Sequence, residues 1–160
     1  MLGCVGFFTK IKQKRGELAM AEQEKQSLAW SAKAAFEERL KLDGIKFASE
    51  DGRAIVRVTY SGKFFEAVTF SFLFDDDGTS AALSVYSIAD FDRDELTDAW
   101  EFCNRVNGKY RWLRFFVDSD RELAATADLT FAHTTAAMTC TELLLRAVAT
   151  LDAVCGELSE

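Results

Sequence analysis

Residues 44–88 contain short segments of alternating apolar and polar residues separated by turns, and this series restricts the fold more than any other feature of the sequence. Strands joined by tight turns pair antiparallel, and Asp-Gly is a favoured hairpin dipeptide. The series therefore predicts an antiparallel sheet. The expected strands are 44–49, 53–60, 64–74 and 80–88, and the expected turns are Asp51–Gly52, Ser61–Gly62–Lys63 and Asp75–Gly78.

Alternation within these segments also predicts which side chains face the core. Successive side chains of a strand point to opposite faces, so Thr69 and Ser71 are expected on the face away from the core. The residues expected on the buried face are Ala54, Val56, Val58 and Tyr60 in the second strand, and Phe64, Val68, Phe70, Phe72 and Phe74 in the third.

Three segments with apolar residues at helical spacing complete the pattern, at 27–43, 92–107 and 135–158. Two more strands are expected at 109–117 and 122–131. The expected order is therefore helix, three or four strands, helix, two strands, helix. The helices must cover one face of the sheet, so the predicted fold class is α+β with two layers, an antiparallel sheet and a helical layer.

The helical segments make predictions at individual residues. The first is expected to bury Leu28, Ala32, Ala35, Phe36 and Leu40, with Ser27 as its N-cap and Gly44 as its stop. The second is expected to bury Leu96, Trp100, Cys103 and Val106 and to end at Asn107–Gly108, since Asn and Gly tolerate the left-handed conformation. The last has a long apolar seam. The apolar surface formed there by Leu143, Leu144, Leu145 and Val148 is wide enough to contact both the sheet and a second subunit.

The sequence divides into a short extension, residues 1–26, and a domain, residues 27–160. The extension starts apolar, turns basic and then becomes polar, which indicates a weakly ordered or helical segment without a packed role, or a weak membrane-surface tether. Met20 is a second candidate for the true start of the protein, because a compact domain could begin there.

Charge and composition exclude several classes of function. The chain has a net charge of −7, which repels phosphate backbones and disfavours non-specific nucleic-acid binding. No apolar run is long enough to cross a membrane, and the four cysteines lack the spacing of a zinc site. We therefore expect a cytoplasmic protein with buried, reduced cysteines, no membrane span, and no metal or cofactor.

The stretch FCNRVNGKYRWLRFFVDSD, residues 102–120, holds the candidate binding residues. Asn104 and Asn107 lie three apart, and we expect Asn104 to bond the backbone of a neighbouring loop. If 109–117 is a strand, then Tyr110, Trp112 and Arg114 share one face of it. Aromatic residues mixed with Arg occur in single-stranded nucleic-acid sites and in protein interfaces. The acidic charge favours the protein interface.

The order of elements, with the N-x-x-N of Asn104 and Asn107 followed by GKYRWLRFFVDSDRELAATADL, resembles the YbjN-domain family of bacterial proteins. These proteins are labelled sensory-transduction regulators and share the fold of type III secretion chaperones. The resemblance covers about residues 27–158, with Val106 where the family is expected to have Leu. It implies a small acidic cytoplasmic homodimer that binds other proteins and has no catalytic residues.

The predicted function is therefore a non-enzymatic, chaperone-like or regulatory module that binds an unidentified protein. The candidate partner-binding residues are Asn104, Asn107, Tyr110, Trp112 and Arg114. The alternative is a ligand-binding or enzymatic domain that uses His133, the only histidine, with nearby carboxylates. That alternative requires a closed pocket that contains His133.

Overall fold

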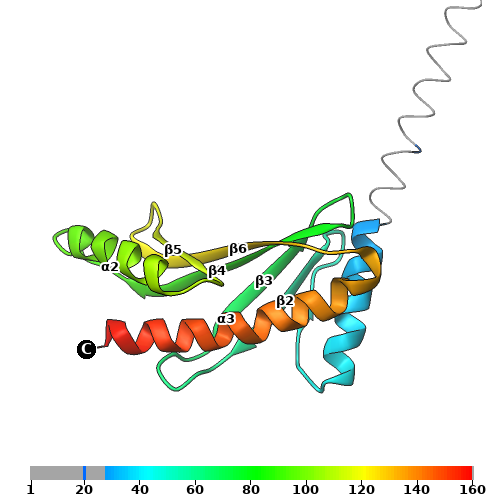
Figure 1. Cartoon of the computed structure of the whole chain (residues 1–160), viewed down its shortest axis with the longest axis horizontal. Helices are drawn as coiled ribbons and strands as arrows, with labels where there is room; N and C mark the ends of the chain where they lie inside the picture. The colour runs from blue at the N-terminus through cyan, green and yellow to red at the C-terminus, as the bar shows by residue number, and fades with distance from the viewer. Residues whose placement is uncertain (1–19, 21–27, 160) are drawn as a thin grey trace, which may run out of the picture.

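The computed structural model describes residue 20 and residues 28–159. The predictions for the extension and for the N-cap at Ser27 lie outside these residues, except that Met20 is helical and exposed. The first described helix contains residues 28–42 and precedes the sheet (Figure 1).

Six strands form one antiparallel sheet in the order β1-β2-β3-β4-β6-β5. Helix α2 lies in sequence between the fourth and fifth strands, and a 3₁₀ turn leads from the last strand into helix α3. The predicted α+β fold and order of elements are thus confirmed. The elements are β1 (Ala48–Ser49), β2 (Ile55–Tyr60), β3 (Val68–Phe74), β4 (Ser80–Asp90), α2 (Leu96–Lys109), β5 (Arg114–Val117), β6 (Glu122–Thr130), η1 (His133–Thr135) and α3 (Ala136–Leu158).

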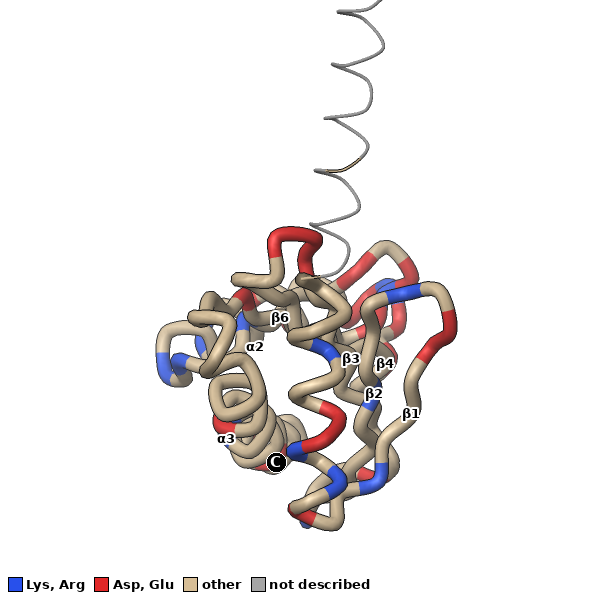
Figure 2. Tube along the Cα trace, turned by 90° about the vertical axis from the view of Figure 1, so that its right-hand side faces the viewer, with Lys and Arg blue, Asp and Glu red and all other residues tan. Residues whose placement is uncertain are grey.

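The helices lie on one side of the sheet, and α3 runs across the strands (Figures 1 and 2). The core between the two layers contains a cluster of aromatic rings, with the centroids of Phe36 and Phe72 4.9 Å apart. Thr69 and Ser71 alternate with the buried residues of β3, as predicted. Within the described residues, no helix is long and apolar enough to cross a membrane.

The buried seam of the first helix differs from the predicted one at two places. Ala29 is buried in place of Leu28, and Ala35 is only half-buried. The buried Lys33 completes the contact with the sheet, since its Nζ donates to the carbonyl oxygens of Glu50 (3.0 Å) and Arg53 (3.2 Å) in the β1–β2 turn. Gly44 ends the helix in the left-handed conformation, φ +69°, as predicted.

The connection between β2 and β3 is longer than predicted, and the expected burial of Phe64 is wrong. Phe64 lies before the strand and is 45% exposed, while Phe65 is buried. The backbone N–H of Phe64 donates to Asp152 Oδ1 of α3 (2.9 Å). The loop is thus bonded to α3, and the alternation of β3 begins at Val68.

Helix α2 differs from its prediction in two respects. Trp100 is 54% exposed, and the buried seam consists of Ala99, Phe102, Cys103 and Val106. The helix does not end at Asn107–Gly108 but continues to Lys109, and Gly108 is not left-handed. The side chain of Asn107 is used for a contact with β5 that the sequence pattern did not predict.

Candidate functional site

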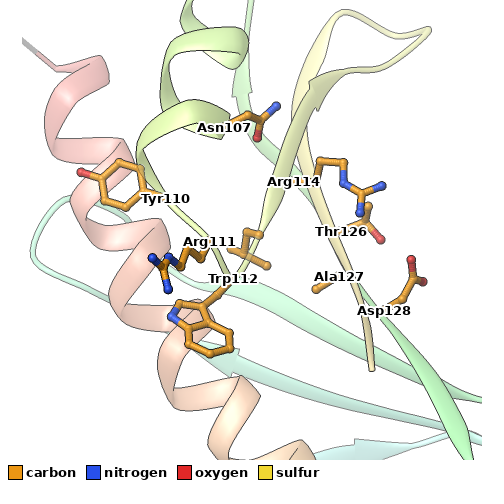
Figure 3. Close-up of a pocket in the computed structure, with 9 residues that line it drawn as sticks. Asn107, Tyr110, Arg111, Trp112, Arg114, Thr126, Ala127 and Asp128 are labelled. Carbon is orange, nitrogen blue, oxygen red and sulfur yellow. The ribbon is translucent and has the colours of Figure 1, made fainter. Parts of the chain in front are cut away.

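The segment between α2 and β5, residues 110–113, is not part of a strand, because β5 begins only at Arg114. The prediction that Tyr110, Trp112 and Arg114 share a sheet face is therefore wrong. Arg114 is exposed on β5, whereas Tyr110 and Trp112 belong to the connecting segment and contact α3. Figure 3 shows this separation, with Trp112 beside α3 and Arg114 on the strand.

Asn107 holds this segment at its strand end. Its Nδ2 donates to the carbonyl oxygen of Phe115 (2.9 Å), and the Phe115 N–H donates to its Oδ1 (2.7 Å). A side-chain amide thus makes the two hydrogen bonds that a neighbouring strand would make. Asn107 therefore attaches the outer edge of β5 to α2, just after residues 110–113.

Asn104 does not make the loop contact that we expected of it. It is exposed on α2, and its side chain makes no hydrogen bond with another described residue. The backbone-bonding role predicted for Asn104 belongs to Asn107, one turn later, while Asn104 stays available at the surface.

Tyr110 attaches the same segment to the end of α3. Its hydroxyl donates to Glu157 Oε1 (2.6 Å), which also accepts from Lys109 Nζ (2.5 Å). The hydrogen bond from Lys109, followed by that from Tyr110, lowers the pKa of the Glu157 carboxyl below its usual 4.5. The hydrogen bond to Glu157 is also the main cause that raises the pKa values of Tyr110 and Lys109.

This contact predicts a pH-dependent contribution to stability. A lowered carboxyl pKa stabilises the fold above the unfolded value and loses this effect as the pH falls through the folded value. We expect the difference in unfolding free energy between wild type and Glu157→Gln to be constant near neutrality and to shrink between about pH 5 and pH 3. Denaturant titrations across this range measure it. A difference that stays unchanged down to pH 3 would contradict the contact.

Trp112 is the most distinctive residue of the segment. Its side chain is 44% exposed, and the guanidinium carbon of Arg146 on α3 lies 4.2 Å from its ring centroid. Arg146 is itself paired with Glu142. A cation held over the ring positions the indole and occupies one of its faces. Trp112 is therefore an ordered aromatic surface rather than a free stacking platform.

Three adjoining hollows surround this residue, with volumes of about 380, 400 and 410 Å³. Arg111 and Trp112 line all three. The first lies against Arg114 and β6 (Figure 3), the second between the segment and α3, and the third between β6 and α3. Each is open to solvent, which suits an extended surface ligand better than an enclosed small molecule.

The charge around these hollows differs from that of the whole chain. Arg111 and Arg114 line the hollows and are exposed, and neither forms an ion pair with another described residue. Asp128 of β6 and Glu142 of α3 are the acidic residues that line the hollows. In a chain of net charge −7, this end therefore has two exposed positive charges without an ion-pair partner among the described residues.

His133 lies elsewhere, in the turn before α3. It is exposed, its Nε2 is 3.1 Å from Ser31 Oγ, and it lines none of the hollows around Trp112. No cluster of three metal-binding side chains is found in residues 28–159. The enzymatic alternative requires His133 inside a closed pocket, whereas the residue is exposed.

Comparison with known proteins places the chain in a family. Residues 33–159 match the YbjN family, described as "Putative bacterial sensory transduction regulator". The chain belongs to this family. Among solved structures it is similar to YbjN from E. coli, described as "a putative transcription regulator", with 12% identity and a TM-score of 0.56 over 76% of this chain and 89% of the other. No curated protein matches significantly.

Proposed function

We propose that this chain is a regulatory protein-binding module without catalytic activity, and that it contacts its partner through residues 110–114 and the hollows around Trp112. The observation that carries the proposal is the position of Trp112, exposed yet held by Arg146 at the shared wall of three open hollows. Ordered aromatic and Arg side chains beside open hollows are typical of the energetic centres of protein interfaces.

Three further observations support a protein partner. The family description is regulatory. One face of Trp112 is already covered by Arg146, which leaves less of the ring for stacking on a base. The overall charge of −7 opposes a phosphate backbone. We propose that the partner is a cytoplasmic protein and that the module binds it in a chaperone-like or regulatory manner.

A matched pair of tryptophan variants tests this function. The tagged protein is purified from its native cells and the copurifying proteins are quantified by mass spectrometry. We expect a stoichiometric partner with wild type and with Trp100→Ala, and a loss of about tenfold or more with Trp112→Ala, because central interface tryptophans carry much of the binding energy. Trp100 is the control because it is exposed to a similar degree on α2, outside the three hollows.

If both variants capture the partner equally, Trp112 is not part of the partner-binding site. The absence of any partner under crosslinking would contradict a protein-binding function and favour a ligand-binding or enzymatic domain. Screening metabolites for thermal shifts of the purified protein would then be the next step.

We also propose that the chain forms a homodimer through the exposed side of α3. Leu145, which the sequence pattern placed toward a second subunit, is 55% exposed, and Met138, two turns earlier on the same side, is 63% exposed. We expect light scattering after size exclusion to give twice the monomer mass at micromolar concentration, and Leu145→Glu to reduce it. A monomer mass for wild type would contradict this arrangement.

A further inference from the structure

The edge of β6 is only partly covered by β5. β5 begins at Arg114, opposite Thr126, and ends at Val117, opposite Leu123. It therefore pairs only with residues 123–126 of β6. On its other side β6 continues to pair with β4 as far as Ser80 opposite Thr130. Residues 127–130 of β6 therefore have a neighbouring strand on one side and none on the other among the described residues.

The hydrogen-bonding pattern shows which backbone groups face this open side. The N–H and C=O of Phe115 bond to Asn107 and so point away from β6. In an antiparallel pair, consecutive residues alternate in direction, so Arg114 and its partner Thr126 point toward each other. The same alternation along β6 directs the N–H and C=O of Asp128 and Thr130 to the open side. Both residues are exposed.

The neighbouring edges of β5 and β6 differ in whether their backbone groups are bonded. The outer edge of β5 is closed by the amide of Asn107, while the edge of β6 next to it is left open. Open edges pair readily with other chains, and proteins ordinarily protect them. Here the open edge borders two of the hollows that Trp112 lines. The arrangement provides backbone groups for strand pairing and side-chain hollows in one place.

We propose that residues 127–130 of β6 receive an extended segment of the partner protein as an added strand, antiparallel to β6 and in line with β5. This inference rests on the proposed protein-binding function and specifies how the partner binds. The segment would lie beside residues 127–130 of β6, where β5 does not extend. Its C-terminal end would lie next to Arg114, where β5 begins.

The surroundings determine the chemistry of this segment. Side chains opposite Ala127 and Leu129 would point to the α3 side, where Trp112 and Leu143 line the hollow. Alternate positions of the segment are therefore apolar. Its C-terminal end would meet Arg111 and Arg114, which are exposed and unpaired within the described chain. We therefore infer an apolar-x-apolar segment followed by an Asp or Glu side chain.

A random octapeptide library displayed on phage and selected on the purified full chain tests this inference. The enriched peptides, synthesised with blocked termini, are then titrated against three variants. Asp128→Pro removes the N–H on the open side without removing a bond to β4, because Asp128 and Ala82 form a non-hydrogen-bonded pair by the same alternation. Asp128→Ala keeps this N–H, and Arg111→Glu reverses a charge.

We expect enriched peptides with the apolar-x-apolar-acidic pattern. Binding should weaken about tenfold or more for Asp128→Pro and for Arg111→Glu, and should change little for Asp128→Ala. Arg93→Glu is the charge control, because Arg93 is exposed and lies outside the hollows. Amide exchange provides a readout that does not depend on the folding of the proline variant. The Asp128 and Thr130 amides should exchange quickly in the free protein and slowly with peptide bound.

Each other result overturns the inference. No enrichment, a basic consensus, or Asp128 and Thr130 amides that stay unprotected would exclude an added acidic strand. A dimer that Asp128→Pro dissociates would make a second copy of this chain the occupant. If a partner copurifies with wild type and with Asp128→Pro alike, the proposed function stands and only the strand addition fails.

Discussion

Replacing Asn107 with alanine is expected to lower the free energy of unfolding by about 2 to 4 kcal/mol, since each buried polar group left unpaired costs about 1–3 kcal/mol. The variant loses both hydrogen bonds to the backbone of Phe115, a residue that is only 2% exposed. The released edge of β5 should also loosen residues 110–113. Urea titration measures the loss, and faster amide exchange at Phe115 locates it.

Asn104→Ala is the matched control, because it makes the same change one turn earlier on α2. Asn104 is exposed, and substitutions at such sites usually change stability by less than about 0.5 kcal/mol. Equal losses of stability for the two variants would show that the effect comes from the helix and not from the two hydrogen bonds between Asn107 and Phe115.

Replacing Gly78 with alanine is expected to destabilise the fold by about 2 to 5 kcal/mol. The residue is in the left-handed conformation, φ +65°, which costs other residues about 1–2 kcal/mol. An added Cβ would also lie 2.6 Å from Leu28 Cβ and 2.8 Å from its backbone carbonyl carbon. Relieving such a clash costs about 1–3 kcal/mol, since the first helix must shift from the β3–β4 turn. Thermal and urea unfolding measure the effect.

Gly108→Ala is the control for this change, and we expect it to raise stability instead of lowering it. Gly108 is within α2, is not left-handed, and has no atom within 4 Å of an added Cβ. Alanine in a helix is favoured over glycine by about 0.5–1 kcal/mol, so the variant should be slightly more stable. A Gly78→Ala variant as stable as wild type would contradict the close contact between the turn and the first helix.

The sheet and the helices could be predicted from the sequence because their signals are local. Alternation in β2 and β3 and helical spacing in α3 each occur within one segment, and the Asp-Gly turns join neighbouring strands. The predictions that failed depend on residues distant in sequence. The backbone of Phe64, for example, is bonded to Asp152, 88 residues later, and no local pattern contains that contact.

The conformation of the candidate site could not be predicted from the sequence. Residues 109–113 have the composition of a strand, yet Tyr110 is drawn to Glu157 and Trp112 to Arg146, so the chain leaves the sheet edge to contact α3. The residues missed were Arg111, Arg146 and Asp128. Arg146 and Asp128 belong to elements predicted to be structural, and only the tertiary fold brings them to Trp112. The open edge of β6 depends on how far β5 extends, which alternation alone does not determine.

Residue-specific photo-crosslinking in the native cells tests most directly that this end of the molecule binds a protein. A photoreactive amino acid is placed at Thr139, which lines the hollow between β6 and α3 but has no proposed contact with the partner, and, as a control, at Arg93. We expect one protein partner crosslinked at Thr139 and none at Arg93, with the crosslink reduced by Asp128→Pro. A Thr139 probe that captures no protein, while the variant remains folded and abundant, would contradict protein binding at this end.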